Sequence, residues 1–155
     1  MTIKKADPKS QVVNKYAKRD YEIIKTFMAG LVLTGAEVKS LRQGHGQLRG
    51  AFVNNKDGEF WLYNATVNPT NANRTVLNET MQMRSRKILL NKKEIDELTT
   101  AKDQSLSIIP LRILTNGRFI KIEIAIAKGL KKFDKRQKIK KRDTERDNAR
   151  TLLRK

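Results

Sequence analysis

The strongest constraint on the fold is a strict alternation of residue types towards the C-terminal end of the chain. From Ile120 to Ile126 every second residue is isoleucine, with Lys, Glu and Ala between them. Period-two alternation is typical of a β-strand with one buried face. Leu106–Leu114, which is rich in branched residues, comes shortly before, and Asn116-Gly117 stands between the two runs. Because Asn-Gly tolerates positive φ at both positions of a tight turn, the sequence predicts an antiparallel hairpin.

Similar patterns predict four more strands. They are Tyr21–Leu33, Ala51–Lys56, Glu59–Val67 and Arg84–Leu90. Asp57-Gly58 would form the turn between the second and the third of these. Ala29-Gly30 would bend the first, because glycine inside a strand often marks a bulge.

Two short helices are expected between the strands. Ala36–Gln43 places apolar residues on one face and stops at Gly44, and a second helix starts after Asn91, which forms a capping box with Glu94. Residues 68–83 show no clear period and are expected to form a loop. Six strands with short peripheral helices predict a mainly β fold, a small closed or partly open barrel. The alternative is a two-layer α+β sheet.

The charge of the chain limits its partners. It has 34 Lys and Arg against 16 Asp and Glu, a formal net charge of +18. This excess predicts a polyanionic partner, with nucleic acid favoured over an anionic membrane. The apolar stretches are far shorter than the roughly 18 residues of a spanning helix, and the polar N-terminus does not resemble a secretory signal. We therefore expect a cytoplasmic protein that has no membrane partner.

An uneven charge distribution divides the chain into three expected segments. They are a flexible basic arm over residues 1–18, the barrel over residues 19–128 and a basic tail over residues 129–155. Residues 128–155 carry a net charge of +9, half of the total excess. Because the tail has few apolar residues, it is expected to be disordered in isolation. It lacks Gly and Pro from Leu130 onwards, so it is expected to become helical on a polyanion; a merely solubilising tail is the alternative.

Catalytic chemistry has little support in the sequence. The chain has no cysteine, which excludes disulfides and thiolate metal sites. His45 is the only histidine and lies between Gly44 and Gly46, where we expect a solvated loop residue rather than a catalytic base. The same three residues lack the third glycine of a dinucleotide-binding loop. We expect no enzyme activity, no cofactor and no metal, with a metal-dependent nuclease built on scattered carboxylates as the alternative.

The aromatic residues leave two questions open. Phe60 and Leu62 alternate with Trp61 and Tyr63, so at least one pair must face away from the interior or lie under a loop. Phe133 lies in a run of Lys and Arg with little to pack against. Its ring either stacks on a nucleobase or folds back onto the rim of the barrel.

Several motifs resemble those of one family. Gly35-Ala-Glu37-Val-Lys39-Ser40-Leu-Arg42 is similar to the GxEVKSLR signature of the SsrA-binding proteins, the SmpB family. Three further segments match the family in order: Asp57-Gly-Glu59-Phe-Trp-Leu62 with Asn64 and Pro69, Arg86-Lys87-Ile-Leu-Leu90 with Glu94-Ile95, and Ala127-Lys-Gly-Leu-Lys131-Lys-Phe133-Asp-Lys-Arg136. Leu130 stands where the family usually has Lys, and Thr70 where an aromatic residue is common.

The resemblance implies a six-stranded barrel like the oligonucleotide-binding (OB) fold, which binds the tRNA-like domain of transfer-messenger RNA (tmRNA). It implies delivery of that RNA to stalled ribosomes for trans-translation, which rescues the ribosome and tags the nascent peptide. Such a protein is not an enzyme. Its tail would occupy the empty mRNA path and contact small-subunit rRNA near the decoding centre. The alternative is a ribosomal or assembly protein, which would bind ribosomal RNA stoichiometrically.

The expected site residues fall into two groups. The tmRNA contacts are Glu37, Lys39, Ser40, Arg42, Asn64, Lys87, Lys121 and Lys128. The ribosome contacts in the tail are Lys131, Lys132, Phe133, Asp134, Lys135, Arg136, Lys138 and Arg142. Lys39 and Arg42 are one helical turn apart, which suits two adjacent phosphates. Glu37 would accept hydrogen bonds from base amino groups or a ribose hydroxyl, unless it pairs internally with Lys or Arg. Asp134 and Lys138 would form an i,i+4 pair that favours the helix.

Overall fold

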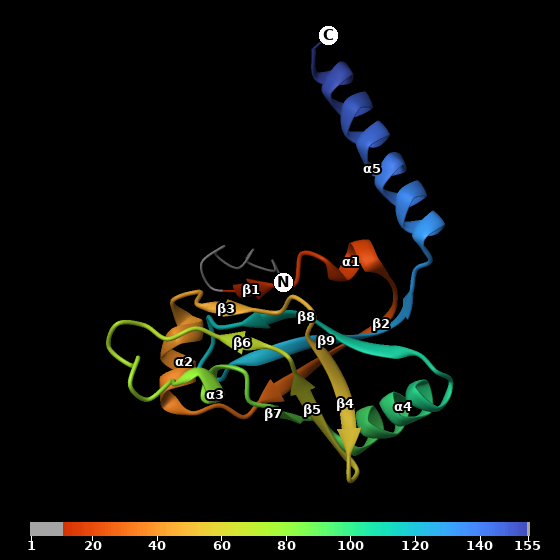
Figure 1. The fold of residues 1–155 in the computed structure, drawn as a ribbon. Helices are drawn as coiled ribbons and strands as arrows, with labels where there is room; N and C mark the ends of the chain where they lie inside the picture. Colours follow the sequence, from red (N-terminus) through yellow and green to blue (C-terminus); the bar gives the residue numbers. More distant parts are fainter. Residues whose placement is uncertain (1–10, 155) are drawn as a thin grey trace.

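The body of the protein is a closed ring of six antiparallel strands from which the last helix projects (Figure 1). The computed structural model describes residues 11–154. In ring order the strands are β8 (Ser107–Leu114), β4 (Phe52–Lys56), β5 (Glu59–Tyr63), β7 (Arg86–Leu89), β2 (Tyr21–Leu31) and β9 (Lys121–Gly129), which pairs with β8 again. The six predicted strands are confirmed, and ring closure excludes an open two-layer sheet.

The start of the described chain adds an edge to this ring. β1 (Gln11–Val13) pairs with the end of β8, and α1 (Ala17–Asp20) follows it. Val12 and Ala17 are buried, so residues 11–18 are anchored to the body. The predicted flexible arm is therefore wrong for these residues, and residues 1–10 lie outside the described part.

Both predicted hairpins form, but with different turns. β4 and β5 are joined by Asp57 (φ +54°) and Gly58 (φ +80°), the positive φ values predicted for a two-residue turn. β8 and β9 are joined by the longer loop 115–120, and neither Asn116 nor Gly117 has a positive φ. The alternating isoleucines of β9 therefore hold this hairpin in register without a tight Asn-Gly turn.

Two strands depart from their predicted shape. The register of β2 against β9 shifts between Ile23 and Lys25, not at the predicted bend. Gly30 stays paired, and a Cβ there would lie 3.3 Å from the Leu89 Cβ, so close approach accounts for the glycine. The predicted strand 59–67 breaks at Asn64, whose φ is +62°; β6 (Thr66–Val67) follows and pairs with β3 (Gly46–Gln47).

Two of the helices begin at a capping box. α4 (Lys92–Asp103) has the predicted capping box, because the Asn91 Oδ1 accepts from the Glu94 N–H at 2.9 Å and the Glu94 carboxylate accepts from the Asn91 N–H at 3.0 Å. α2 (Gly35–Arg42) begins in the same way at Thr34. α3 (Glu79–Gln82) is a short helix within the segment predicted to be a loop.

The core lies inside the ring. The isoleucines of β9 point inwards, and Phe60 and Leu62 of β5 are also buried there. Trp61 and Tyr63 are therefore the pair on the outer face, where both are partly buried. Leu41 of α2 and Leu98 of α4 extend the same core.

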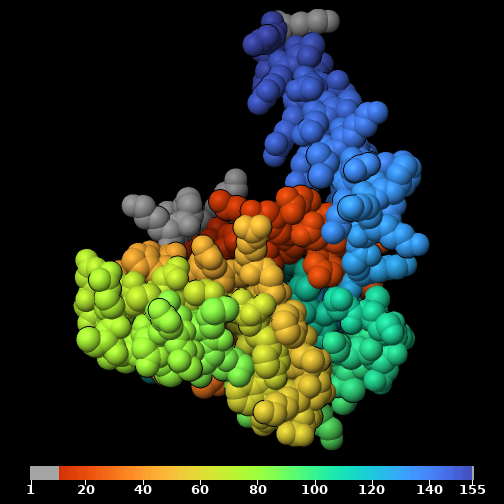
Figure 2. All heavy atoms as spheres, viewed as in Figure 1, coloured from red at the N-terminus to blue at the C-terminus, as the bar shows by residue number. Residues whose placement is uncertain are grey.

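α5 (Lys132–Leu153) extends away from the ring and exposes almost all its side chains (Figures 1 and 2). The prediction of a disordered tail is therefore corrected to a helix, which the many helix-forming residues and the lack of Gly and Pro favour locally. At its base, the Lys138 Nζ donates to the Tyr21 carbonyl at 3.4 Å and the Lys135 Nζ lies 3.7 Å from Asp20. Within residues 11–154 no helix is both long and apolar enough to cross a bilayer.

Candidate nucleic-acid interface

Exposed cations gather where α2 meets the β8–β9 loop. The Arg42 guanidinium donates to the carbonyls of Gly117 at 3.1 Å and Arg118 at 3.3 Å, which ties the last turn of α2 to this loop. The side chains of Arg118 and Lys121 are exposed in the loop and at the start of β9. Three cations from two segments that are distant in sequence are thus brought to one end of the ring.

An apolar groove of about 320 Å³ lies beside these cations. Leu89 and Phe119 line it and are 53% and 70% exposed. The Arg118 guanidinium lies 5.4 Å from the centre of the Phe119 ring. Exposed apolar groups can hold a nucleobase while adjacent cations neutralise its phosphates. We call Lys39, Arg42, Leu89, Arg118, Phe119 and Lys121 the α2 platform.

Half of this platform was missed in the sequence. Leu89, Arg118 and Phe119 were not among the expected contacts. The isoleucine alternation could have predicted that Phe119 is exposed. Ile120 faces inwards, so residues 119 and 121 on either side of it face outwards. For Leu89 the same reasoning applies, since the neighbouring Ile88 is buried.

Glu37 lies in the interior and not on the RNA-facing surface. Its carboxylate is fully buried and accepts from the Arg84 Nε at 2.8 Å, the Arg84 Nη2 at 2.6 Å and the Arg86 Nε at 2.9 Å. The Thr34 N–H donates to the same carboxylate at 2.9 Å. The expectation of a base contact is therefore wrong, and the internal-pairing alternative is confirmed.

The partners of Glu37 connect several segments. Arg86 is 1% exposed and also donates to the carbonyls of Ala65 (2.8 Å), Met81 (3.2 Å) and Gln82 (2.9 Å). One buried ion pair therefore joins α2 to the end of α3, to β7 and to the segment between β5 and β6. This network holds α2 in place below its exposed cations.

This network makes stability depend on pH. Burial raises the pKa of Glu37, but hydrogen bonds from Arg84 and Thr34 and the charges of Arg86 and Arg84 together hold it below its ordinary value of 4.5. A lowered folded-state pKa adds stability that is present above the unfolded pKa and is lost as the pH falls through the folded pKa. We expect Glu37→Gln to flatten the fall in the free energy of unfolding below pH 4.5. Urea unfolding at a series of pH values measures this, and an acid limb as steep as that of the wild type would contradict it.

Ser40 is also buried, which corrects its expected RNA contact. The Asn73 Nδ2 donates to the Ser40 Oγ and to the Ala36 carbonyl, both at 3.0 Å. The Asn73 Oδ1 accepts from the Thr70 N–H at 2.6 Å. Ser40 and Asn73 thus hold the loop after β6 against α2. A shallow groove of about 370 Å³ lies between this loop and α2, and exposed Lys39 lines it.

Three other expected tmRNA contacts are not part of the α2 platform. Lys87 pairs with Glu59 at 2.6 Å on the outer face of β7 and β5. Asn64 is exposed in the turn after β5. Lys128 lies near the opposite end of β9 from Lys121 and pairs in register with Glu22. The expected set therefore does not form one continuous patch.

The tail residues occupy different environments along α5. Phe133 is 68% exposed, so its ring does not fold back onto the rim of the ring of strands. Lys138 donates to the Tyr21 carbonyl and, among the described residues, forms no ion pair with Asp134, contrary to the predicted i,i+4 pair. Lys135 faces Asp20. The other expected contacts are exposed: Lys131, Lys132, Asp134, Arg136 and Arg142.

Known proteins resemble this chain over most of its length. Residues 11–154 match the family model of the SmpB protein. The SsrA-binding protein of Synechococcus sp. (strain JA-3-3Ab) is 43% identical over 145 residues, covering 93% of this chain and 94% of the relative. That of Coprothermobacter proteolyticus is 46% identical over 136 residues, covering 86% and 90%.

A solved structure extends the similarity to the fold. The matching chain comes from work on tmRNA-SmpB and the centre of the bacterial ribosome. It superposes with a TM-score of 0.66 at 34% identity, covering 84% of this chain and 94% of the other. Sequence and fold agree along the same residues, and the chain belongs to the SmpB family.

Proposed function

We propose that this protein binds the tRNA-like domain of tmRNA and delivers it to stalled ribosomes for trans-translation. The observation that carries the proposal is the match to the SmpB family over residues 11–154. The net charge of +18 and the α2 platform support it, because both suit a folded RNA partner. The protein acts by binding and without a catalytic step, in the cytoplasm where ribosomes work.

The ring of strands supports a finer assignment of the fold. We infer that it is an OB-type barrel, a fold that binds nucleic acid through one face and its connecting loops. The α2 platform combines both kinds of element, because Leu89 and Lys121 lie on strands and Arg118 and Phe119 lie in a loop.

Within the α2 platform the side chains divide by chemistry. Lys39, Arg42 and Lys121 neutralise phosphates, and Leu89 and Phe119 pack against bases or ribose. Lys87, Asn64 and Lys128 contact the RNA at points outside this platform. Glu37 and Ser40 act from within by holding α2.

Removing one platform cation tests this surface. We expect Lys121→Gln to weaken binding of a tRNA-like domain transcript and to lower the slope of log K against log salt by roughly 0.7–0.9, the value for one lost phosphate contact. Lys93→Gln, at an exposed position on α4, is the matched control and should leave the slope unchanged. Fluorescence anisotropy at several salt concentrations gives both values. Equal slopes for the two variants would show that Lys121 does not contact phosphate.

The tail supplies the second contact in this proposal. α5 lies along small-subunit rRNA near the decoding centre, with Phe133 stacked on an exposed base and Asp134, Lys135 and Arg136 against the adjacent backbone. The exposure of Phe133 and of most α5 cations supports this. RNA sequencing after capture of the full chain from a bacterial lysate distinguishes the proposal from a ribosomal or assembly protein. Enrichment of tmRNA supports delivery, whereas stoichiometric rRNA alone contradicts it.

A further inference from the structure

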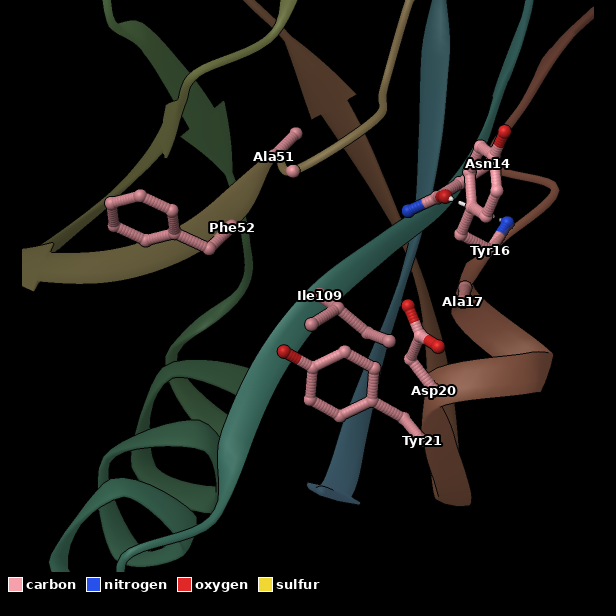
Figure 3. Close-up of a pocket in the computed structure, with 9 residues that line it drawn as sticks. Asn14, Tyr16, Ala17, Asp20, Tyr21, Ala51, Phe52 and Ile109 are labelled. Carbon is pink, nitrogen blue, oxygen red and sulfur yellow. Dashed lines mark hydrogen bonds between the residues drawn. The ribbon is translucent and has the colours of Figure 1, made fainter. Parts of the chain in front are cut away.

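The short helix α1 is fixed to the ring of strands at several points. Ala17 is buried and packs with Ile109 of β8 and Ala127 of β9 in a small apolar cluster. The ring of Tyr21, directly after the helix, packs against the same cluster beside Ile109 (Figure 3). Before the helix, the Asn14 Nδ2 donates to a backbone carbonyl of β8 at 3.0 Å. α1 therefore forms a rigid base on the body of the protein.

A single residue separates this base from α5. The antiparallel pairing of β2 and β9 ends at Tyr21 and Gly129. The Leu130 N–H extends it by one step, because it donates to the Asp20 carbonyl at 3.0 Å. Only Lys131 then precedes α5, with an extended backbone (φ −69°, ψ 159°) and no side-chain cap. A helix of 22 residues is about 33 Å long, so a rotation of about 20° at this residue moves its far end by roughly 11 Å. Contacts beyond this residue must therefore decide the direction of α5.

α5 starts beside α1 and turns one face towards it (Figure 1). Four side chains on this face have the i, i+3, i+4 and i+7 spacing of one helical stripe: Lys135, Lys138, Ile139 and Arg142. The Lys135 Nζ lies 3.7 Å from the Asp20 carboxylate, and the Lys138 Nζ donates to the Tyr21 carbonyl at 3.4 Å. The last three of the four line a narrow crevice together with Arg19 of α1.

This contact between α1 and α5 is positive on both sides apart from one carboxylate. α5 brings three cations to it, and α1 brings Arg19. In the described part of the chain, Asp20 is the one acidic residue outside α5 that forms an ion pair with it. Asp20 also accepts from the Arg19 Nε at 3.2 Å, so it neutralises a cation from each helix. Without this carboxylate the cations of the two helices would repel each other at short range.

We propose that Asp20 is a positioning residue, which docks α5 on α1 and so sets the direction in which the tail leaves the body. This docking is a property of the free protein and goes beyond the proposed function, which concerns what the tail binds. Exposed ion pairs are individually weak, so α5 docks reversibly and the docked fraction falls as the salt concentration rises. Cations outside the stripe, such as Arg136 and Lys140, stay exposed in the docked state.

The test measures the distance from the body to the far end of α5 in the full chain. Because the sequence has no cysteine, Lys93→Cys on α4 and Asn148→Cys on α5 place one spin label on each. Electron–electron double resonance should give a single narrow distance distribution. Asp20→Lys should broaden it and shift its mean by roughly 10 Å, the displacement caused by a rotation of about 20° at the base of a helix of this length.

Two further variants show whether the ion pair itself is responsible. Asp20→Lys combined with Lys135→Asp restores the pair with its charges exchanged and should restore the narrow distribution. Asp103→Lys makes the same charge change at an exposed position on α4 and should leave the distribution unchanged. A narrow and unshifted distribution in Asp20→Lys would overturn the inference. Equal broadening in Asp103→Lys, or no recovery in the charge exchange, would overturn it as well.

Peptide tagging separates this inference from the proposed function, on which the tagging result rests. Asp20→Lys should keep its affinity for the tRNA-like domain transcript but lower tagging several-fold, and the charge exchange should recover tagging. Wild-type distances and wild-type tagging in Asp20→Lys would overturn the docking and leave the proposed function intact. If the wild-type chain neither binds the transcript nor supports tagging, the proposed function fails, and the distance measurement still decides the docking.

Discussion

Glu37→Ala is expected to lower the free energy of unfolding by about 3–5 kcal/mol, the cost of leaving a buried charge without its partner. Arg86 is 1% exposed and Arg84 is partly buried, so neither guanidinium can regain full hydration when the carboxylate is removed. The hydrogen bonds from both arginines and from the Thr34 N–H are lost together. Urea unfolding at pH 7 measures the change.

A surface ion pair provides the matched control. Glu59 accepts from Lys87 at 2.6 Å, a distance as short as those at Glu37, but both side chains are exposed. Glu59→Ala should therefore cost only about 0–1 kcal/mol, because water replaces the lost partner. If Glu37→Ala costs no more than Glu59→Ala, the buried network does not hold α2. Under conditions in which the Glu37→Gln variant is folded, it should bind tmRNA with the affinity of the wild type. A lower affinity of the folded variant would indicate that Glu37 contacts the RNA.

Truncation after Gly129 is expected to abolish peptide tagging while leaving affinity for the tRNA-like domain close to that of the full chain. The reason is geometric, because α5 extends from the body and meets it at α1, away from the α2 platform (Figure 1). At 0.15 M salt, charges further than about 8 Å from the bound RNA contribute little. Tagging is measured in reconstituted translation of an mRNA that lacks a stop codon.

A helix-breaking variant separates the shape of the tail from its charge. Gln137→Pro keeps every charged residue but disrupts α5 by about 3 kcal/mol, because proline lacks the N–H group and clashes with the preceding turn. It should lower tagging strongly, whereas Gln137→Ala should not. If the truncated chain loses tmRNA binding outright, or if either disrupted chain tags at the full rate, the division between body and tail is wrong.

Local patterns in the sequence determined most of the strands and the starts of two helices. The alternation from Ile120 to Ile126 predicted a half-buried strand because side chains of a strand point to opposite faces in turn. The Asn91 and Glu94 capping box and the Asp57-Gly58 turn are interactions between near neighbours, so they too can be read locally. Family membership was accessible for a different reason, since four motifs in order are specific enough to identify it.

Only the tertiary structure decided what pairs with what across the ring. Glu37 was expected to contact RNA because a carboxylate can accept hydrogen bonds from bases or ribose, whereas its actual partners, Arg84 and Arg86, lie far from it in the sequence. Phe119 and Leu89 line the same groove because β9 and β7 both lie next to β2 in the ring. Composition and periodicity indicate which residues are favourably buried and which are favourably exposed within one segment. The free energy of a buried ion pair or a shared groove depends on contacts between distant segments, and those exist only once the ring of strands has closed.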